Sequence, residues 1–432
     1  MQSIWQQTAD LPRFSPLRGE EKADVLVIGG GIAGLLCAWQ LKQAGADCLL
    51  LEAGRICGGV TAGTTAKITA QHGLVYDTLL QRFGEEGARA YLEANLEALA
   101  RYRSLCAEFS CDFEEKDAFV YTLDDRAALE REVQALARLR YRAELAEGLP
   151  LPFPTAGAVR FPRQGQFHPL KFLAQIAAGL RVCEESPVTE LRGMTAVTDH
   201  GRVKAGQIVV ATHFPFLNKH GSYFLKLHQQ RAYVLALEGG PQLGGMYLDG
   251  SGKGYSFRNY GGLLLLGGPS RRPGRKSDGW RELEEFSARH FPGAKPAARW
   301  AAQDCMTLDG MPYVGQYSIR TPGLYAAAGF QKWGMTGSMA AASVLADLVL
   351  GRENRYAAAF SPSRSMLQPQ LLLNAAEAVR GMFPPWGRRC PHMGCALRWN
   401  PQEHSWDCPC HGSRFSADGE LLNNPANDDA GL

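Results

Sequence analysis

Four residues near the C-terminus have the types and the spacing of a metal site. Cys390 and His392 are separated by one residue, and Cys408 and His411 follow 15 residues later with two residues between them. Two thiolates and two imidazoles can hold one zinc ion tetrahedrally. They can also hold a [2Fe–2S] cluster, with both thiolates on one iron and both imidazoles on the other. The spacing alone leaves both metals open.

Three further details favour the iron–sulfur cluster over zinc. Each of the two loops carries a second cysteine, Cys395 in the first and Cys410 in the second, and Gly412-Ser413 follows the second histidine. The stretch 419–425, Gly-Glu-Leu-Leu-Asn-Asn-Pro, is similar to the closing motif of Rieske [2Fe–2S] proteins. Residues 388–426 as a whole resemble that family.

The Rieske resemblance implies specific roles for these six residues. It implies Cys390 and Cys408 as ligands of one iron and His392 and His411 as ligands of the other. It also implies a disulfide between Cys395 and Cys410, which is an unusual bond in a cytoplasmic protein. Rieske domains usually have a β-sandwich base, but residues 361–389 contain too few strand signals to build one. We therefore expect the cluster loops to pack on the rest of the chain or on another subunit.

A glycine-rich turn near the N-terminus has the pattern of a dinucleotide site. Gly29, Gly31 and Gly34 follow an apolar run at 24–28 that is typical of a buried parallel strand. These glycines allow a tight turn, a close approach of pyrophosphate and close packing of the next helix. Glu52 ends the following strand, where it can bind a ribose hydroxyl. We find no second G-x-G-x-x-G, which favours a resident FAD over a nicotinamide cofactor.

Residues 20–355 also resemble a known family of flavoenzymes. Residues 25–52, 207–212, 309–315 and 322–337 are similar to the D-amino-acid oxidase and glycine oxidase family of FAD-dependent oxidoreductases. The resemblance implies an α/β FAD-binding domain of the glutathione-reductase type, which is Rossmann-like. It also implies an α+β substrate domain with an antiparallel sheet over the flavin. The start of a helix at 334–336 would then face the flavin and stabilise negative charge there. The remaining residues that we predict to bind FAD are Thr65, Val188, Gly329, Gly334, Met335 and Thr336.

The catalytic residues are less well marked by the sequence. The candidates are Lys67, which is placed to approach the flavin ring or to be a surface lysine, and Arg231 and Tyr255 on the expected sheet. Tyr233 and Arg258 are further candidates for the pocket. An arginine there can bind a carboxylate through two hydrogen bonds. The small-molecule substrate, an amine or amino acid, is expected by family analogy alone.

The totals of the chain restrict its class. With 46 basic and 43 acidic residues in 432, the net charge of +3 argues against a nucleic-acid partner. We expect no transmembrane segment, because the apolar runs are short, and without a visible secretory signal we expect a cytoplasmic location. The expected domains are the FAD domain at 1–80, 155–215 and 300–355, the substrate domain at 81–154 and 216–299, a linker at 356–387, and the Rieske segment at 388–432.

Together the two sites predict an FAD-dependent oxidoreductase, most simply a dehydrogenase of an amine or amino acid. Flavin takes two electrons at once and a [2Fe–2S] cluster moves one, so the pair suits delivery to an electron-carrier protein. Two alternatives stay open. One is a reductase or monooxygenase in which electrons enter at the cluster. The other is a flavoprotein whose C-terminal segment is a structural zinc knuckle.

Overall fold

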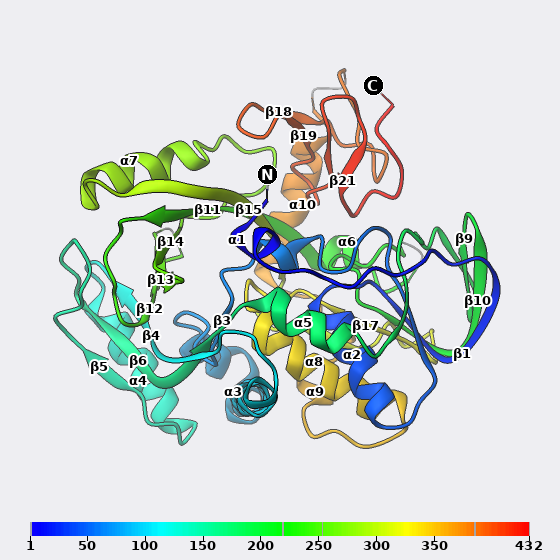
Figure 1. The fold of residues 1–432 in the computed structure, drawn as a ribbon, viewed down its shortest axis with the longest axis horizontal. Coiled ribbons are helices and arrows are strands. Elements are labelled where there is room, and N and C mark those ends of the chain that lie inside the picture. Colours follow the sequence, from blue (N-terminus) through cyan, green and yellow to red (C-terminus); the bar gives the residue numbers. More distant parts are fainter. Residues whose placement is uncertain (1, 218–219, 253, 384–385, 432) are drawn as a thin grey trace.

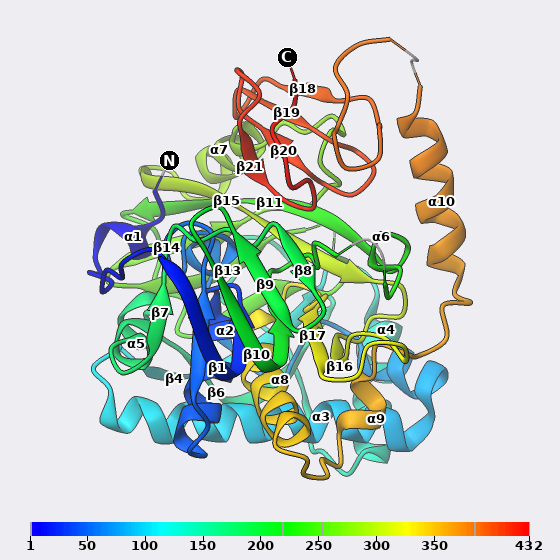
Figure 2. The same ribbon diagram turned by 90° about the vertical axis from the view of Figure 1, so that its right-hand side faces the viewer.

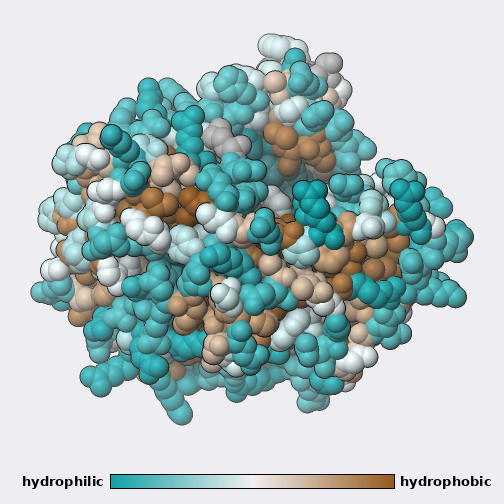
Figure 3. Space-filling view, viewed as in Figure 1, coloured by the Kyte–Doolittle hydropathy of each residue, from teal (hydrophilic) through white to brown (hydrophobic). Residues whose placement is uncertain are grey.

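A computed structural model describes residues 2–217, 220–252, 254–383 and 386–431. Two large sheets form the body of the molecule, and a small sheet formed by the C-terminal residues lies on top of them (Figure 1). The surface in this view is mostly hydrophilic, with smaller apolar patches between the polar side chains (Figure 3).

The first large sheet carries the glycine-rich turn. Its main path runs β16-β17-β10-β1-β2-β7, and five of these six strands are parallel. The strands of this sheet are β1 (Gly19–Ile28), β2 (Cys48–Leu51), β7 (Arg181–Cys183), β8 (Glu190–Arg192), β9 (Thr195–Thr198), β10 (Gly201–Val210), β16 (Tyr313–Gln316) and β17 (Leu324–Ala328).

Both faces of this sheet are buried, because its central strands are apolar on both sides. Val25 and Val27 of β1 pack in the cluster that includes α2 (Ile32–Gln43) and α8 (Gly334–Val349). Leu26 and Ile28 point to the opposite face. This arrangement is typical of parallel sheets in α/β proteins. It places the turn after β1 and the end of β2 at one edge of the sheet.

The second large sheet has nine strands, and most neighbouring pairs are antiparallel. Its path runs β15-β11-β14-β13-β12-β4-β6-β3, and β5 pairs with β6. Its strands are β3 (Lys67–Ile68), β4 (Glu114–Thr122), β5 (Glu144–Ala146), β6 (Gly157–Gln166), β11 (Leu227–Glu238), β12 (Met246–Asp249), β13 (Ser256–Tyr260), β14 (Leu263–Gly267) and β15 (Lys295–Thr307).

The nine-stranded sheet crosses the residue boundaries that the sequence suggested. Strands β3 and β6 lie in it, although we expected ranges 1–80 and 155–215 to form the FAD domain, and β15 passes residue 300. The physical reason is that β6 pairs with β4 along its length. The backbone N–H and C=O groups of β6 therefore find their hydrogen-bond partners in this sheet. The two sheets, rather than the expected ranges, mark the two units.

The remaining helices surround the two sheets. They are α1 (Ile4–Gln7), the 3₁₀ helix η1 (Val60–Gly63), α3 (Tyr76–Glu108), α4 (Arg126–Arg138), α5 (Pro169–Ala177), α6 (Tyr223–Lys226), α7 (Trp280–His290) and α9 (Ala357–Phe360). Within the described residues, no helix is long and apolar enough to cross a membrane.

The C-terminal segment begins with α10 (Pro369–Gly381) and continues as a four-stranded sheet. Its strands, in spatial order, are β18 (Arg398–Asn400), β19 (Ser405–Asp407), β20 (Arg414–Phe415) and β21 (Leu421–Asn423). The segment lies against β11 and β15 (Figure 1), and Gln229 and Gln303 of these strands donate hydrogen bonds to its backbone. The expectation that the cluster loops pack on the rest of the chain is confirmed.

Candidate active site and cluster site

The glycine-rich turn has the geometry that a dinucleotide requires. Gly29 has a φ of +109°, and a side chain there would lie 2.6 Å from the carbonyl oxygen of Ala211. A side chain on Gly34 would lie 1.9 Å from the carbonyl oxygen of Gly29. At Gly31, in contrast, a side chain would meet nothing closer than the Thr61 hydroxyl at 3.4 Å, so its absence leaves open space at the start of α2. This space and the free N–H groups of a helix start suit a pyrophosphate.

A cavity of about 1110 Å³ extends from this turn between the two large sheets. It exceeds the usual range for small ligands, as a bound dinucleotide requires. The predicted residues Gly29, Gly31, Glu52, Thr65, Lys67, Val188, Gly334 and Met335 all line it. Glu52 accepts hydrogen bonds from the backbone of Gly30 and Gly54, which fixes its carboxylate at the end of β2. The cavity therefore fits FAD.

Three of the predicted cofactor residues do not line the cavity but hold in place the elements that do. Gly34 packs α2 on the turn, and a side chain on Gly329 would lie 2.3 Å from Thr307. The Thr336 hydroxyl donates to the backbone of Thr69 and lies 3.0 Å from His72. These contacts fix the start of α8, whose first residues Gly334 and Met335 line the cavity.

Lys67 is buried and points toward the sheet over the cavity. Its ammonium donates a hydrogen bond to the carbonyl oxygen of Tyr247 at 3.2 Å. Burial, together with the nearby charge of Arg258, lowers its pKa to about 7. A lysine in this state can exchange a proton near neutral pH. Of the two readings of Lys67, the structure contradicts the surface lysine.

Three other candidates do not reach the cavity. The guanidinium of Arg231 forms a two-pronged ion pair with Glu403 of the C-terminal segment. Arg258 donates to the carbonyl oxygens of Thr65 and Ala66 and so holds the loop before β3. The ring of Tyr255 packs on Phe286, with 4.0 Å between centroids. Arg231 therefore positions the C-terminal segment instead of binding a substrate carboxylate, because the carboxylate of Glu403, distant in sequence, already occupies its guanidinium.

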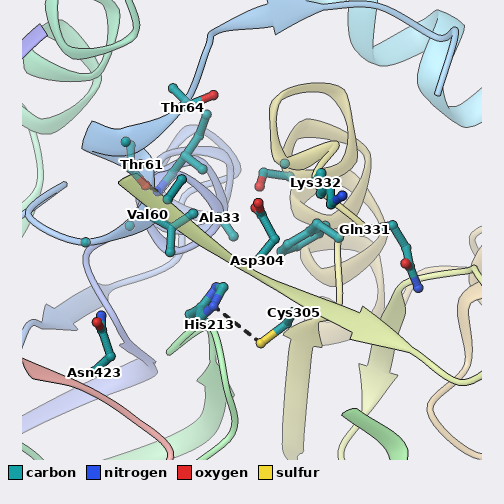
Figure 4. A pocket seen from close by; sticks show the side chains of 18 of the residues that line it. Ala33, Val60, Thr61, Thr64, His213, Asp304, Cys305, Gln331, Lys332 and Asn423 are labelled. Carbon is teal, nitrogen blue, oxygen red and sulfur yellow. Dashed lines mark hydrogen bonds between the residues drawn. The ribbon is translucent and has the colours of Figure 1, made fainter. Parts of the chain in front are cut away.

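The structure brings three polar residues to the cavity that the sequence analysis did not single out. Asp304 on β15 and Lys332 before α8 lie on one wall, and His213 follows β10 on another (Figure 4). Burial raises the pKa of Asp304 to about 6, and the charge of Lys332 opposes this rise. Burial lowers the pKa of His213 to about 4, so its ring is neutral. Only the position of His213, directly after a parallel strand, could have marked it in advance.

The four predicted cluster ligands lie together in the C-terminal segment. The thiols of Cys390 and Cys408 are in hydrogen-bond contact, and the rings of His392 and His411 are 5.0 Å apart between centroids. The ring of His411 donates to the backbone of Phe224, and its Nδ1 is buried with no hydrogen-bond partner among the described residues. A neutral imidazole with one nitrogen fixed and the other free is the form that binds a metal. The residues fit the cluster.

The second pair of cysteines forms the predicted disulfide. The sulfur atoms of Cys395, Cys408 and Cys410 lie within 4.8 Å of one another, but Cys395 and Cys410 are joined in a disulfide. The disulfide removes these two sulfurs from the thiolate set and leaves Cys390 and Cys408 as the thiolates of the site. It also ties the two ligand loops together.

The C-terminal segment contributes directly to the wall of the FAD cavity. Asn423, Asn424 and Asp428 line it, and Figure 4 labels Asn423 among the lining side chains. The amide of Asn424 donates to the carbonyl oxygens of Thr212 at 2.8 Å and Phe214 at 3.0 Å. One cavity is therefore bounded both by the predicted FAD-binding residues and by residues of the cluster segment.

Comparison with known proteins identifies both parts of the chain. Residues 24–348 match the family described as FAD dependent oxidoreductase. The chain belongs to this family. Residues 359–430 match the Rieske [2Fe-2S] domain, a match that includes α10 and begins within the range expected to be a linker. The predicted cofactors, FAD and a Rieske cluster, agree with these two matches.

Several relatives of this FAD-dependent oxidoreductase are known. A protein of Bacillus subtilis (strain 168) called "Putative Rieske 2Fe-2S iron-sulfur protein YhfW" is 32% identical over 98% of this chain and 96% of its own length. Glycine oxidase from Geobacillus kaustophilus has a TM-score of 0.69 at 22% identity and covers 80% of this chain and 99% of its own. L-proline dehydrogenase from P. horikoshii has a TM-score of 0.67 at 18% identity, with coverages of 80% and 98%. These structures share the fold.

Proposed function

We propose that the protein oxidises a C–N bond of an amine or amino acid at its FAD. We further propose that electrons pass between the FAD and the Rieske cluster to an external electron-carrier protein. The observation that carries this proposal is the shared cavity, because residues of the cluster segment form part of the wall of the flavin site. A cluster with a separate role would not need to close that wall.

A chain of hydrogen bonds joins the cavity wall to a cluster ligand and supports this coupling. The Nε2 of His213 lies 3.3 Å from the side-chain oxygen of Gln229. The amide of Gln229 donates to the carbonyl oxygen of His411 at 2.9 Å, and Gln303 donates to Gln229 at 2.7 Å. Gln229 and Gln303 are both buried at this contact.

The charges in the cavity favour a substrate that carries an amino group. Asp304 supplies a carboxylate above about pH 6, which can pair with a substrate ammonium. Lys332, on the same wall, supplies a cation that can pair with a substrate carboxylate. Together the two charges match an amino acid, while a simple amine would use Asp304 alone. The known relatives named glycine oxidase and L-proline dehydrogenase are consistent with this class.

The bound flavin supplies the acceptor for the two electrons that leave the C–N bond. The protein residues do the rest. Asp304 and Lys332 orient the substrate, and Lys67, whose pKa is lowered to about 7 by burial, holds a proton at its Nζ on the wall of the cavity. The start of α8 at Gly334 faces the cavity and stabilises negative charge there.

Anaerobic titration of the purified protein with a panel of amines and amino acids tests the proposal. Absorbance reports the flavin, and electron spin resonance reports the cluster. We expect at least one member to reduce the flavin and then the cluster. If no member reduces either site, the proposed substrate class is wrong. If the flavin is reduced while the cluster stays oxidised, the proposed transfer between them is wrong.

A further inference from the structure

Helix α10 has its polar face turned inward and its apolar face turned outward. The exposed positions of the helix are Pro369, Leu372, Leu373, Ala375, Ala376, Val379 and Arg380, of which only the last is polar. A surface helix of a globular protein normally shows the opposite arrangement. Figure 2 shows α10 on the outer flank of the molecule, with no other element beyond it.

The inward face is polar because it is bound to the body of the protein. Asn374 accepts a hydrogen bond from Arg272 and donates to the carbonyl oxygen of Leu225 at 3.4 Å. Glu377 pairs with Arg275. The helix also packs on the cluster loops, since a side chain on Gly381 would lie 2.1 Å from the Cys410 sulfur. These contacts fix which face of α10 points outward, so its apolar side cannot rotate inward.

The chain on either side of the helix also has exposed apolar side chains. The helix and these flanks together have large hydrophobic side chains that are at least half exposed, namely Leu367 (87%), Leu372 (75%), Leu373 (58%), Val379 (59%), Met382 (50%), Phe383 (63%) and Trp386 (75%). We call these residues the α10 face. Thirteen large hydrophobic residues are exposed among the described residues, and seven of them lie in this stretch of 20 positions. Such a concentration marks an interaction site.

The charges around the α10 face select the kind of partner. Between residues 367 and 400 the sequence has four arginines, Arg380, Arg388, Arg389 and Arg398, and one acidic residue, Glu377, whose carboxylate pairs with Arg275 and Arg380. A second copy of the chain in a symmetric dimer would bring these arginines against their own equivalents. An anionic partner is therefore favoured over self-association.

Two anionic partners remain, an acidic protein and a lipid surface, and the lack of polar groups on α10 distinguishes between them. Protein interfaces carry about one hydrogen bond per 100–200 Å². The outward surface of α10 offers Arg380 as its polar side chain and is otherwise Leu, Ala, Val and Pro. Leucine and aromatic residues on one face with arginines at its border are typical of helices that lie in the surface of a membrane. A lipid surface fits this composition better than an acidic protein.

We propose that the α10 face binds the protein to the surface of an anionic phospholipid membrane. Leu372, Leu373, Val379, Phe383 and Trp386 enter the headgroup region, and the arginines contact lipid phosphates. The helix lies on the membrane and does not cross it, as its 13 residues require. This inference is independent of the substrate. It places the cluster loops, which α10 supports, next to the membrane.

Flotation of the purified holoprotein with lipid vesicles tests the inference. The vesicles are phosphatidylcholine alone, or phosphatidylcholine with about 30% phosphatidylglycerol, because anionic lipid attracts basic segments. We expect binding to the second kind at about 0.15 M salt, and weaker binding at about 1 M salt, where charges are screened. Failure of the wild-type protein to float with anionic vesicles overturns the inference.

Variants localise the binding to the α10 face. The double variant Leu372→Glu/Val379→Glu should lower the partition coefficient by at least about tenfold, because two apolar side chains no longer enter the lipid. Arg380→Gln should lower it by about fivefold. The matched control is Ile319→Glu, since Ile319 is equally apolar, 80% exposed and distant in sequence. Unchanged flavin and cluster absorbance shows that each variant is folded.

Each other outcome contradicts the inference. If the double variant floats as well as the wild type, or if Ile319→Glu weakens binding equally, the α10 face is not the membrane site. Analytical ultracentrifugation tests whether the face binds a second copy of the chain. If the wild type is a dimer and the double variant is a monomer, the face is a dimer interface. Binding to an acidic redox protein without binding to vesicles would assign the face to that protein.

Discussion

A buried group of charges should hold the cluster segment on the nine-stranded sheet. Glu403, whose side chain is 9% exposed, pairs with Arg231, which is 11% exposed. It also accepts a hydrogen bond from the Tyr233 hydroxyl at 3.0 Å and pairs with Arg414 at 3.0 Å. The substitution Glu403→Gln keeps the size of the side chain and removes its charge. It leaves the guanidinium of Arg231 buried without its ion-pair partner, with Asp407 as a remaining nearby negative charge.

The size of the effect follows from this burial. Breaking a buried ion pair by removing one partner costs about 3–5 kcal/mol. The amide of glutamine still accepts one hydrogen bond from Arg231, so we expect about 3 kcal/mol, at the lower end of that range. The control is Asp278→Asn, because the pair of Asp278 with Arg281 is at least half exposed on both sides. Exposed pairs contribute about 0–1 kcal/mol.

Urea unfolding of the holoprotein measures this effect, with cluster absorbance and flavin absorbance followed separately. We expect Glu403→Gln to move the midpoint of the cluster signal far more than Asp278→Asn does. Equal shifts in the two variants would show that the buried pair of Glu403 and Arg231 stabilises the cluster segment no more than an exposed pair does. In a double-mutant cycle, Arg231→Met should lower the free energy of unfolding less in the Glu403→Gln background than in the wild type, because the ion pair is already broken.

The same carboxylate predicts a dependence on acid. Burial opposes ionisation of Glu403, but the hydrogen bonds and charge of Arg231 outweigh it, so the pKa lies below its usual 4.5. A depressed pKa stabilises the folded state above the unfolded pKa, and the stabilisation is lost as the pH falls through the folded pKa. The wild-type cluster signal should therefore lose stability below about pH 4.5, whereas Glu403→Gln should lack this part of the acid sensitivity.

Three further predictions concern the cavity and the residues that support it or connect it to the cluster. Asp304→Asn should raise KM for amine substrates, and the fall of the wild-type KM as pH rises through about 6 should disappear in steady-state assays, since Asp304 ionises there. Gln229→Leu should slow reduction of the cluster in stopped-flow experiments without slowing reduction of the flavin, because it removes the hydrogen bond to His411; it should also cost about 1–3 kcal/mol of stability. Gly34→Ala should abolish the flavin absorbance of the purified protein, because the new methyl group would lie 1.9 Å from the Gly29 carbonyl oxygen.

Both cofactor sites could be recognised from the order of the residues. The turn with Gly29, Gly31 and Gly34 and the loops with Cys390 and Cys408 are recognisable because each site is built from residues close together along the chain. Steric demands on a glycine and the ligand needs of a metal are local, so they leave a pattern in the spacing of residue types.

How the two sites meet, and what surrounds them, depends on how distant segments fold together. Arg231 is predicted from sequence to lie in a pocket, but it forms an ion pair with Glu403, which lies 172 positions later. Asp304 faces the cavity because of its register on β15, which depends on pairing with β11. The outward apolar face of α10 depends on the contacts of Asn374 and Glu377 with distant arginines. Contacts between segments far apart in the chain determine which charges are paired and which faces are covered. These contacts cannot be predicted from the spacing of residue types.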